Sequence, residues 1–524
     1  MANNYFESEE FREILDAYEK SVIAQETVYF DEDDFADIAD HYLQLDKSDL
    51  GMIAVEKGLA CHKDSEVLLS MKSAILIYRR DFDQAIEIIN NLDKNSSDIR
   101  YQLAQLKYAY DMDSEGAEKL FRKWMKAEDY EHSDEEGKRE IYMHIISSFV
   151  ELRGKDERGM NLWDVVMVRK WVEEYMSNFS PLGKYDTDIQ VIDLCKDNDL
   201  ADLMVKGLNE ILEERPYVNK GWQNLALAYF TLCKYEQALE ACDFALAINP
   251  NDKEALLTKA HSMYALNNKK GCIEYFQAYI ENGGEPMQYV PLADCLFFAG
   301  KKDEAIAELR KFEDAMMGDH IDLSFNNDAE MKQAYIHLLI DAADLYFQNN
   351  CPDDAIRVYN VIGQVDETNW NAFFMVGACH IMKADLQGAF EAFDEAVVRA
   401  EDPVMVALDI LMAFAFNNYP KCSIVVFDTV QNICDTHSTS EFAKNFTTVK
   451  SLCYLKNGDI DLFYENFKLA INESPKFVRI VYDGIFPEEM ATEEWYDYAK
   501  NHIDEIDVDN WTAKRKNNEN DNDN

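Results

Sequence analysis

The run from Asp111 to Gly116 (Asp-Met-Asp-Ser-Glu-Gly) has the residue types and spacing that a calcium site would use. Oxygen ligands at alternate positions, followed by a glycine, suit the sharp turn of a calcium-binding loop. The twelfth position of such a loop carries a bidentate glutamate, whereas this sequence has Arg122 there, whose cation would repel the ion. The fifth position is glutamate instead of aspartate or asparagine. We therefore interpret the run as an acidic turn between two helices and expect no bound metal.

Signatures of catalysis are missing from the sequence. It contains no G-x-G-x-x-G, P-loop, G-x-S-x-G or H-E-x-x-H motif, the patterns that mark nucleotide, acyl-transfer and metalloprotease sites. The ten histidines are spread singly, which is typical of surface or core histidines. We expect no catalytic residue, no cofactor and no enzymatic activity.

The charge balance limits the class of partner. The 524 residues include 51 Lys and Arg against 100 Asp and Glu, which gives a net charge of −49. A field of this sign repels phosphate backbones and anionic lipids, so it disfavours nucleic-acid and membrane binding and favours basic or neutral partners. A second interpretation is that the carboxylates are solvated outer faces that keep a long chain soluble.

Cysteine usage and hydropathy favour a cytoplasmic location. The eleven cysteines form no C-x-x-C pair and are odd in number, so we expect buried free thiols in a reducing compartment. The N-terminal residues are acidic and lack the basic and apolar regions of a secretory signal. The most apolar stretch, residues 404–416, is too short to cross a bilayer and contains Asp409.

Residues 219–252 predict two short amphipathic helices joined back to back. Apolar residues recur there at the spacing of one helical face, twice in succession. The first face is Trp222, Leu225, Ala226 and Tyr229, and the second is Ala238, Leu239, Cys242, Ala245 and Leu246. Pro250 ends the second helix because its ring and missing N–H cannot continue it. The small Ala226 and Ala238 would let the two helices cross closely.

This stretch resembles the tetratricopeptide repeat (TPR), whose signature is W-x2-L-G-x2-Y followed by A-x3-F, A and P. The matching residues are Trp222, Leu225, Tyr229, Ala238, Ala245 and Pro250. Ala226 replaces the glycine and Cys242 replaces the phenylalanine, and both keep the interior apolar. The opening DEDDFADIADHY, residues 31–42, is similar to the start of a group of uncharacterised bacterial TPR proteins. The resemblance implies a superhelical solenoid of helical hairpins that binds other proteins.

The same pattern returns along the chain with a period near 34 residues. The small position of the second helix is taken by Met204, Ala238, Cys272, Ala305, Ala355 and Ala389. Gly300 precedes Ala305 by five residues, where a TPR has its interhelical turn. Only 19 Gly and 10 Pro occur, too few for a turn-rich β protein. The predicted fold class is all-α, a superhelical (α-α) solenoid of about twelve TPR-like antiparallel hairpins.

Two segments interrupt the period and set the predicted domain organisation. Residues 131–184 form an irregular helical pair, a candidate kink or boundary, and residues 315–335 form an insertion that fits no repeat template. The predicted parts are a cap helix and hairpins at 1–130, the irregular pair at 131–184, a central array at 185–314, the insertion at 315–335, a C-terminal array at 336–475, a helical cap at 476–511 and a disordered tail at 512–524.

TPR arrays usually bind partners along the concave face made by their first helices, and the matching positions here are mostly aromatic and aliphatic. They are Gln223, Leu227, Phe230, Leu257, His261, Tyr264, Val290, Asp294, Phe297, Phe298, Phe347 and Phe374, and the same face includes Ile340, Asp344 and Met382. Buried aromatic residues are common binding anchors, so we expect a groove for an apolar segment that can include a basic residue. The alternative is that these side chains pack only against neighbouring hairpins.

Some TPR domains hold the C-terminal carboxylate of heat-shock chaperones with Lys, Arg and Asn on their first helices. The equivalent positions here offer Lys220 and Asn224, but the next repeat has Glu254 and Thr258, and Glu254 would oppose an anion. We therefore expect no chaperone-tail clamp.

The leading interpretation is a non-catalytic cytoplasmic scaffold that binds a protein or peptide. One alternative is a structural module that associates with a second copy of itself. The other is a regulatory subunit of an enzyme complex, or an enzyme whose site lies in 131–184 or 315–335.

Overall fold

Every regular element in the described part of the chain is a helix in the computed structural model. The structure describes residues 6, 8–24, 29–128, 130–152, 164–196, 200–318, 329–487, 489–506 and 508. The chain separates into two compact units, Met1–Asn282 and Gly283–Asn524, and each is described by itself. The predicted all-α fold class, a solenoid of stacked helical hairpins, is confirmed.

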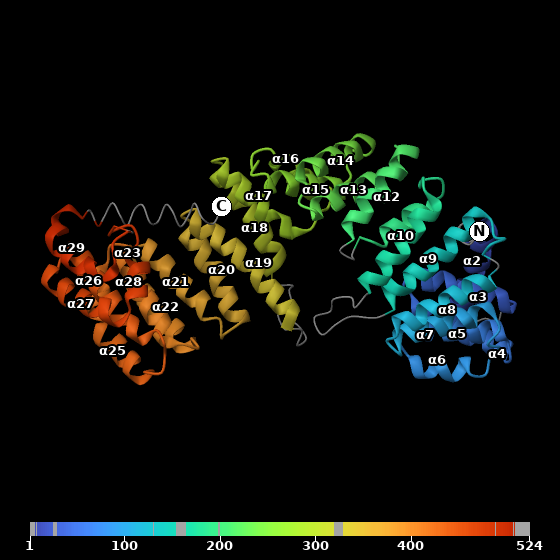
Figure 1. Cartoon of the computed structure of the whole chain (residues 1–524), viewed down its shortest axis with the longest axis horizontal. Helices are drawn as coiled ribbons and strands as arrows, with labels where there is room; N and C mark the ends of the chain where they lie inside the picture. The colour runs from blue at the N-terminus through green and yellow to red at the C-terminus, as the bar shows by residue number, and fades with distance from the viewer. Residues whose placement is uncertain are drawn as a thin grey trace. The chain divides into compact units, whose positions relative to one another are not determined.

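The first unit is a series of antiparallel helix pairs (Figure 1). Its helices are α2 (Glu9–Ala24), α3 (Glu32–Gln44), α4 (Ser48–Cys61), α5 (Glu66–Tyr78), α6 (Phe82–Ile89), α7 (Ser97–Ala109), α8 (Ser114–Ala127), α9 (Glu135–Glu151), α10 (Val165–Phe179), α11 (Asp186–Asp193), α12 (Ala201–Glu214), α13 (Asn219–Thr231), α14 (Tyr235–Ile248), α15 (Lys253–Ala265) and α16 (Ile273–Glu281). From α3/α4 to α15/α16, each pair packs as one hairpin, and contacts such as α4 with α5 and α14 with α15 join successive hairpins. This is the nearest-neighbour arrangement of a repeat array.

The second unit continues with the same kind of hairpin. Its helices are η1 (Pro286–Gln288), α17 (Tyr289–Phe298), α18 (Lys302–Met317), α19 (Ala329–Gln348), α20 (Pro352–Val365), α21 (Trp370–Met382), α22 (Leu386–Arg399), α23 (Pro403–Phe416), α24 (Pro420–Val425), α25 (Phe427–Thr436), η3 (Ala443–Asn445), α26 (Phe446–Asn457), α27 (Ile460–Glu473), α28 (Pro475–Val481), η4 (Thr492–Glu494), α29 (Trp495–His502) and η5 (Ile503–Glu505). The second helix after α23 is broken into α24 and α25, and α28 and α29 pack against α27.

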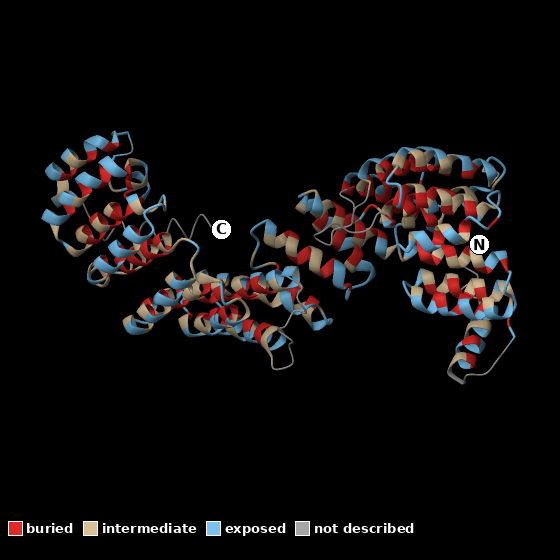
Figure 2. Cartoon of the chain, turned by 90° about the horizontal axis from the view of Figure 1, so that it is seen from below, coloured by how far each residue is buried: buried red, intermediate tan, exposed pale blue. Residues whose placement is uncertain are grey.

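Small residues lie where the two helices of a hairpin cross. The following residues are all 0% exposed: Ala85, Ala117, Ala238, Cys272, Ala305, Ala355 and Ala389. Figure 2 shows buried residues along the faces where paired helices meet. The crossing is tight, because a Cβ atom on Gly377 would lie 2.4 Å from the ring of Phe393. Ala226 and Cys242, which replace TPR signature residues, are also fully buried.

The turn inside these hairpins contains one residue in the left-handed conformation. These residues are Asp46, Arg80, Met112, Cys233, Asn267, Gly300, Asn350, Ala384, Asn418 and Gly458, with φ between +55° and +81°. Each except Gly458 precedes a small buried residue at the helix crossing by five positions, as Cys233 precedes Ala238, whereas the residue five positions after Gly458 is Phe463. The turn closes the first helix, because the Cys233 N–H donates to Phe230 O (2.8 Å) and the Lys234 N–H donates to Tyr229 O (2.9 Å). Most of these residues are not glycine, although glycine adopts this conformation at least cost.

A buried ion pair ties α9, α10 and α11 together. The Arg139 guanidinium (1% exposed) donates from Nε to Asp188 Oδ1 (0% exposed) at 2.9 Å. The Tyr175 hydroxyl donates to the same oxygen at 2.5 Å, and the backbone N–H groups of Gly183 and Tyr185 donate to Oδ2 at 2.9 and 3.2 Å. Asp188 therefore has four donors and Arg139 is neutralised, which is what two buried charges require.

The two segments that interrupt the sequence period contain described helices. Regular helices α9 and α10 fill most of 131–184, and they lie inside the first unit, whose end at Asn282 falls within the predicted central array. The helices α18 and α19 fill both ends of 315–335. Residues 153–163 and 319–328, and the predicted tail 512–524, lie outside the described residues.

Cys272 shows one difference in helix boundaries. The 34-residue spacing predicts Cys272 inside the second helix, whereas α16 begins at Ile273 and Cys272 is its N-cap residue. The preceding residues form a turn instead, in which the Gly271 N–H donates to Asn268 Oδ1 at 3.1 Å. The cysteine nevertheless keeps its buried place at the crossing.

Replacing Ala384 with glycine is expected to stabilise the protein. Alanine at φ +58° costs roughly 1–2 kcal/mol relative to right-handed backbone, and glycine removes this cost while losing roughly 0.5–1 kcal/mol of unfolded-state entropy. Urea unfolding of Ala384→Gly should show a gain of up to about 1 kcal/mol. The matched control is Ala378→Gly inside α21, which should lose about 1 kcal/mol. Equal changes in the two variants would contradict this account of the turn.

Asp188→Asn is expected to destabilise the first unit strongly. The substitution leaves the Arg139 charge buried without its counter-ion, which typically costs about 3–5 kcal/mol. The control is Asp186→Asn two residues away, because the ion pair of Asp186 with Arg215 is 82% and 36% exposed and should contribute less than about 1 kcal/mol. Chemical unfolding measures both. Similar losses would show that the buried pair has no special role.

Candidate functional site

Six of the predicted groove residues lie on two neighbouring first helices of the first unit. They are Gln223, Leu227 and Phe230 on α13 and Leu257, His261 and Tyr264 on α15, and all six are half-buried. The helices α13 and α15 are in contact, and the ring centroids of Phe230 and His261 are 6.4 Å apart. These six residues therefore lie on two adjacent helices, and we call them the α13/α15 face.

One member of this face makes an internal contact. The side-chain amides of Gln223 and Asn219 both donate to Asp252 Oδ2. Asp252 is also the N-cap residue of α15, where its Oδ1 accepts the Ala255 N–H at 3.0 Å. Gln223 therefore helps to join two hairpins, and the sequence-based prediction of it as a groove residue did not include this structural role.

The two residues that hint at a chaperone-tail clamp are held by a carboxylate of this chain. The Lys220 ammonium lies 2.8 Å from Asp193 Oδ2, and the Asn224 amide donates to Asp193 Oδ1 at 2.7 Å. Asp193 comes from α11 of the preceding hairpin. Asp193 therefore binds both the Lys220 ammonium and the Asn224 amide.

The remaining predicted groove residues belong to the second unit. Val290, Asp294 and Phe297 are half-buried on α17, and their neighbour Phe298 is 57% exposed. The half-buried Phe347 lies on α19 and Phe374 on α21. The Phe374 ring is 5.4 Å from the ring of Phe393 in the same hairpin, so intramolecular packing, the alternative to a binding role, holds for at least part of its surface.

First helices of the second unit also carry carboxylates that are partly removed from water. Burial raises the pKa of Asp409 on α23 to about 6, and it also raises the pKa values of Asp341 and Asp344 on α19. Asp344 accepts a hydrogen bond from the Tyr359 hydroxyl. The sequence signals Asp409 only as a single acid within an apolar helix.

The calcium-like run serves as a helix cap. Asp113 Oδ1 accepts the Gly116 N–H at 2.8 Å at the start of α8, and the Lys107 ammonium lies 2.9 Å from Asp111 and 3.4 Å from Asp113. Arg122 is paired with Glu118 and Glu174 elsewhere. Across the described residues, no group of three His, Cys, Asp or Glu side chains is placed to hold a metal ion.

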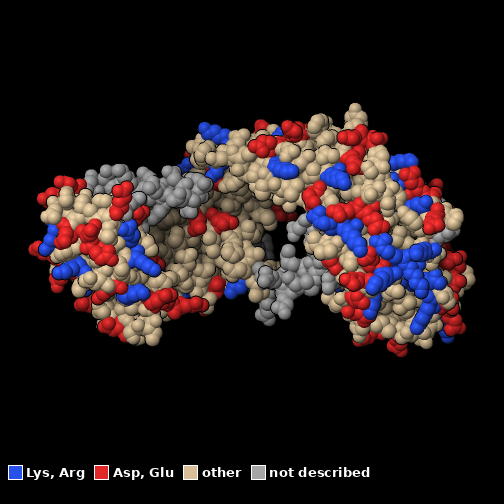
Figure 3. Space-filling view, viewed as in Figure 1, with Lys and Arg blue, Asp and Glu red and all other residues tan. Residues whose placement is uncertain are grey.

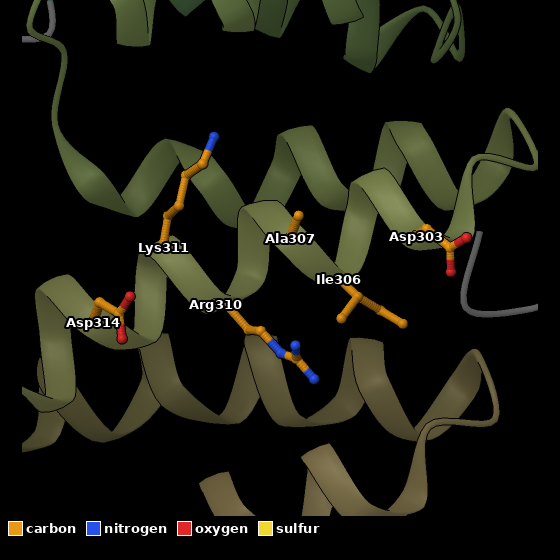
Figure 4. A pocket seen from close by; sticks show the side chains of 6 residues that line it. All are labelled: Asp303, Ile306, Ala307, Arg310, Lys311 and Asp314. Carbon is orange, nitrogen blue, oxygen red and sulfur yellow. The ribbon is translucent and has the colours of Figure 1, made fainter.

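A hollow of about 510 Å³ lies along α18 (Figure 4). Its lining comes from this one helix and consists of Asp303, Ile306, Ala307, Arg310, Lys311 and Asp314. Lys311 pairs with Glu308 at 2.9 Å, and Arg310 lies 3.6 Å from Asp354. The hollow includes none of the predicted groove residues, and its two cations, Arg310 and Lys311, have carboxylate partners within the chain.

Among the described helices, none has both the length and the hydrophobicity that a membrane span requires.

Comparisons with known proteins identify one repeat directly. Residues 220–252 match the family model of the tetratricopeptide repeat, which is the α13/α14 hairpin. No curated protein matches the chain.

Several solved structures are similar to parts of the chain. YrrB, titled a TPR protein with an unusual peptide-binding site, is 16% identical with a TM-score of 0.31, over 38% of this chain and 96% of that one. The C-terminal part of a TPR repeat-containing protein from Cytophaga hutchinsonii is 12% identical with a TM-score of 0.33, over 48% and 96%. The APC/C hetero-tetramer Cut9–Hcn1 is 12% identical with a TM-score of 0.27, over 79% and 88%.

The repeat at 220–252 has the same tight crossing and left-handed turn as the other hairpins of the chain. Repeats of this kind form scaffolds for protein–protein interaction. Residues 220–252 of the chain form a tetratricopeptide repeat.

Proposed function

We propose that this chain is a non-catalytic scaffold that holds an apolar segment of a partner protein on the α13/α15 face. The observation that carries the proposal is the surface itself. Leu227, Phe230, Leu257, His261 and Tyr264 are half-buried, so each is fixed by its own helix while part of its surface is left for contact.

The chemistry of this face favours a particular kind of ligand. Aromatic side chains supply a large apolar contact area, and the hydroxyl of Tyr264 adds a polar group. Binding energy at protein interfaces is usually concentrated in a few such aromatic anchors. The net charge of −49 would attract a segment that includes a basic residue.

The contacts that hold α13 in place support the proposal of a rigid binding surface. Asp193 and Asp252 hold α13 from the preceding and following hairpins. A surface whose backbone is already ordered loses less entropy when it binds. The eleven cysteines are free thiols, which supports the cytoplasmic location that remains part of the proposal.

The test is a double substitution, Phe230→Glu with Tyr264→Glu, in pull-downs that are crosslinked and analysed by mass spectrometry. Charging both anchors should reduce capture of the specific partner at least about tenfold, the effect of losing a hot spot. The matched control is Phe244→Glu with Ile248→Glu on α14, because these residues are 54% and 37% exposed on the second helix. It should capture as much partner as the wild type.

Unchanged capture by the double variant would reject the α13/α15 face as the binding site. Equal losses in both variants would show that added charge alone weakens binding. Circular dichroism and thermal unfolding should show that all variants keep the wild-type fold. Sedimentation velocity at several concentrations would separate partner binding from association with a second copy.

A further inference from the structure

The helix α8 has a basic outer face in a strongly acidic chain. Its sequence, SEGAEKLFRKWMKA, contains four cationic residues against two glutamates, whereas the whole chain has a net charge of −49. Three of the cations, Lys119, Lys123 and Lys126, are exposed, and we call them the basic stripe. Figure 3 shows Lys and Arg side chains gathered over this part of the first unit.

The packing of α8 directs the basic stripe outward. Its core-facing residues are Ala117, Phe121, Trp124 and Met125. The three lysines recur at i, i+4 and i+7, which places them on one face of the helix. Their positions are separated along the helix axis by about 6 Å and 4.5 Å, so the stripe is roughly 10 Å long.

The cations next to the basic stripe form ion pairs with carboxylates of the chain, but within the described residues the three lysines of the stripe do not. Arg122 pairs with Glu118 at 2.9 Å and with Glu174 at 2.8 Å, and Lys170 pairs with Glu118 at 2.7 Å. In the described ranges, the side chains of Lys123 and Lys126 form no ion pair or hydrogen bond. Positive charge is therefore left facing solvent at one place on a surface that is otherwise rich in carboxylates.

Lys119 already acts on a carboxylate. The pKa of Asp113 is lowered first by the hydrogen bond from the Gly116 N–H and then by Lys107, with a smaller contribution from Lys119. No ion pair within 4 Å joins Lys119 to another described residue. Its ammonium group can thus approach an added carboxylate together with Lys123 and Lys126.

We propose that the basic stripe binds an extended acidic segment of a partner polypeptide. Alternate side chains of an extended strand lie on the same face roughly 6.6 Å apart, close to the axial separation of Lys119 and Lys123. Carboxylates at alternate positions can therefore meet successive lysines. Charge complementarity of this kind mainly sets the rate of encounter and the choice of partner.

A polypeptide fits this surface better than a nucleic acid does. A phosphate backbone carries charge along its whole length and would meet the surrounding carboxylates as soon as it extended beyond the stripe. A short acidic segment concentrates its charge over about 10 Å and can be followed by neutral residues. This inference goes beyond the proposed function, since α8 is the second helix of a different hairpin from α13 and α15.

The experiment measures binding of a labelled peptide of alternating Glu and Ser to the full chain by fluorescence anisotropy. The test variant carries Lys→Glu at all three positions of the basic stripe, and a milder variant carries Lys→Gln. The matched control changes the same net charge at three scattered exposed lysines, Lys234, Lys421 and Lys476. A Gln and Ser peptide and a short DNA duplex serve as comparison ligands.

We expect the acidic peptide to bind the wild type and the control alike, and the stripe variant at least about tenfold more weakly. Binding should also weaken when salt rises from about 50 mM to about 500 mM, because exposed charges are screened. Several outcomes would overturn the proposal: no binding of the acidic peptide, equal loss in the control, or duplex DNA that binds as tightly through the same lysines. A salt-sensitive dimer that is lost in the stripe variant would assign the surface to a second copy.

Discussion

The close crossing of two helices within each hairpin is the contact on which the rest of this structure depends. In most hairpins a left-handed residue ends the first helix, and five residues later a small buried residue lets the second helix approach. The two helices leave little room for larger side chains, because a Cβ atom added to Gly377 would lie 2.4 Å from the ring of Phe393. Once the crossing is set, each hairpin presents a fixed face to the next, and the array grows by repeating that contact.

The two proposed binding surfaces depend on this arrangement. A first helix that is held on both sides by neighbouring hairpins can expose part of its apolar face without losing its position. For α13, the holding contacts are polar as well as apolar, because Asp193 and Asp252 bind its side-chain amides and its lysine. The second helix α8 carries exposed lysines on the side that faces away from its buried residues.

The repeating parts of the fold could be predicted from the sequence, because they depend on local spacing. The period of small residues and the turn at Gly300 identified the hairpins. The other turns were harder to predict, since residues such as Arg80, Met112 and Cys233 have no preference for left-handed backbone and adopt it only because the hairpin requires it. The Arg139–Asp188 pair joins residues 49 positions apart, and a local sequence pattern does not predict a contact over that separation.

The candidate site shows the same limit. Sequence spacing predicted the residues of the α13/α15 face as a binding site, and in the structure they lie on adjacent helices. The sequence spacing could not predict that Gln223 is bound by Asp252. Nor could it predict that Lys220 and Asn224 are bound by Asp193, since these partners come from neighbouring hairpins. The identity of the ligand depends on a second molecule, whose chemistry this sequence reflects only through charge and apolar surface.

The measurement that tests the central claim most directly is hydrogen exchange of Ala238→Leu compared with wild type, read peptide by peptide. Ala238 is 0% exposed at the α13/α14 crossing, and a larger side chain there should cost about 1–3 kcal/mol by overpacking. If hairpins are coupled only to their neighbours, faster exchange should be confined to α13/α14 and the adjacent hairpins. Faster exchange spread evenly over both units, or no change at α13/α14, would contradict the account.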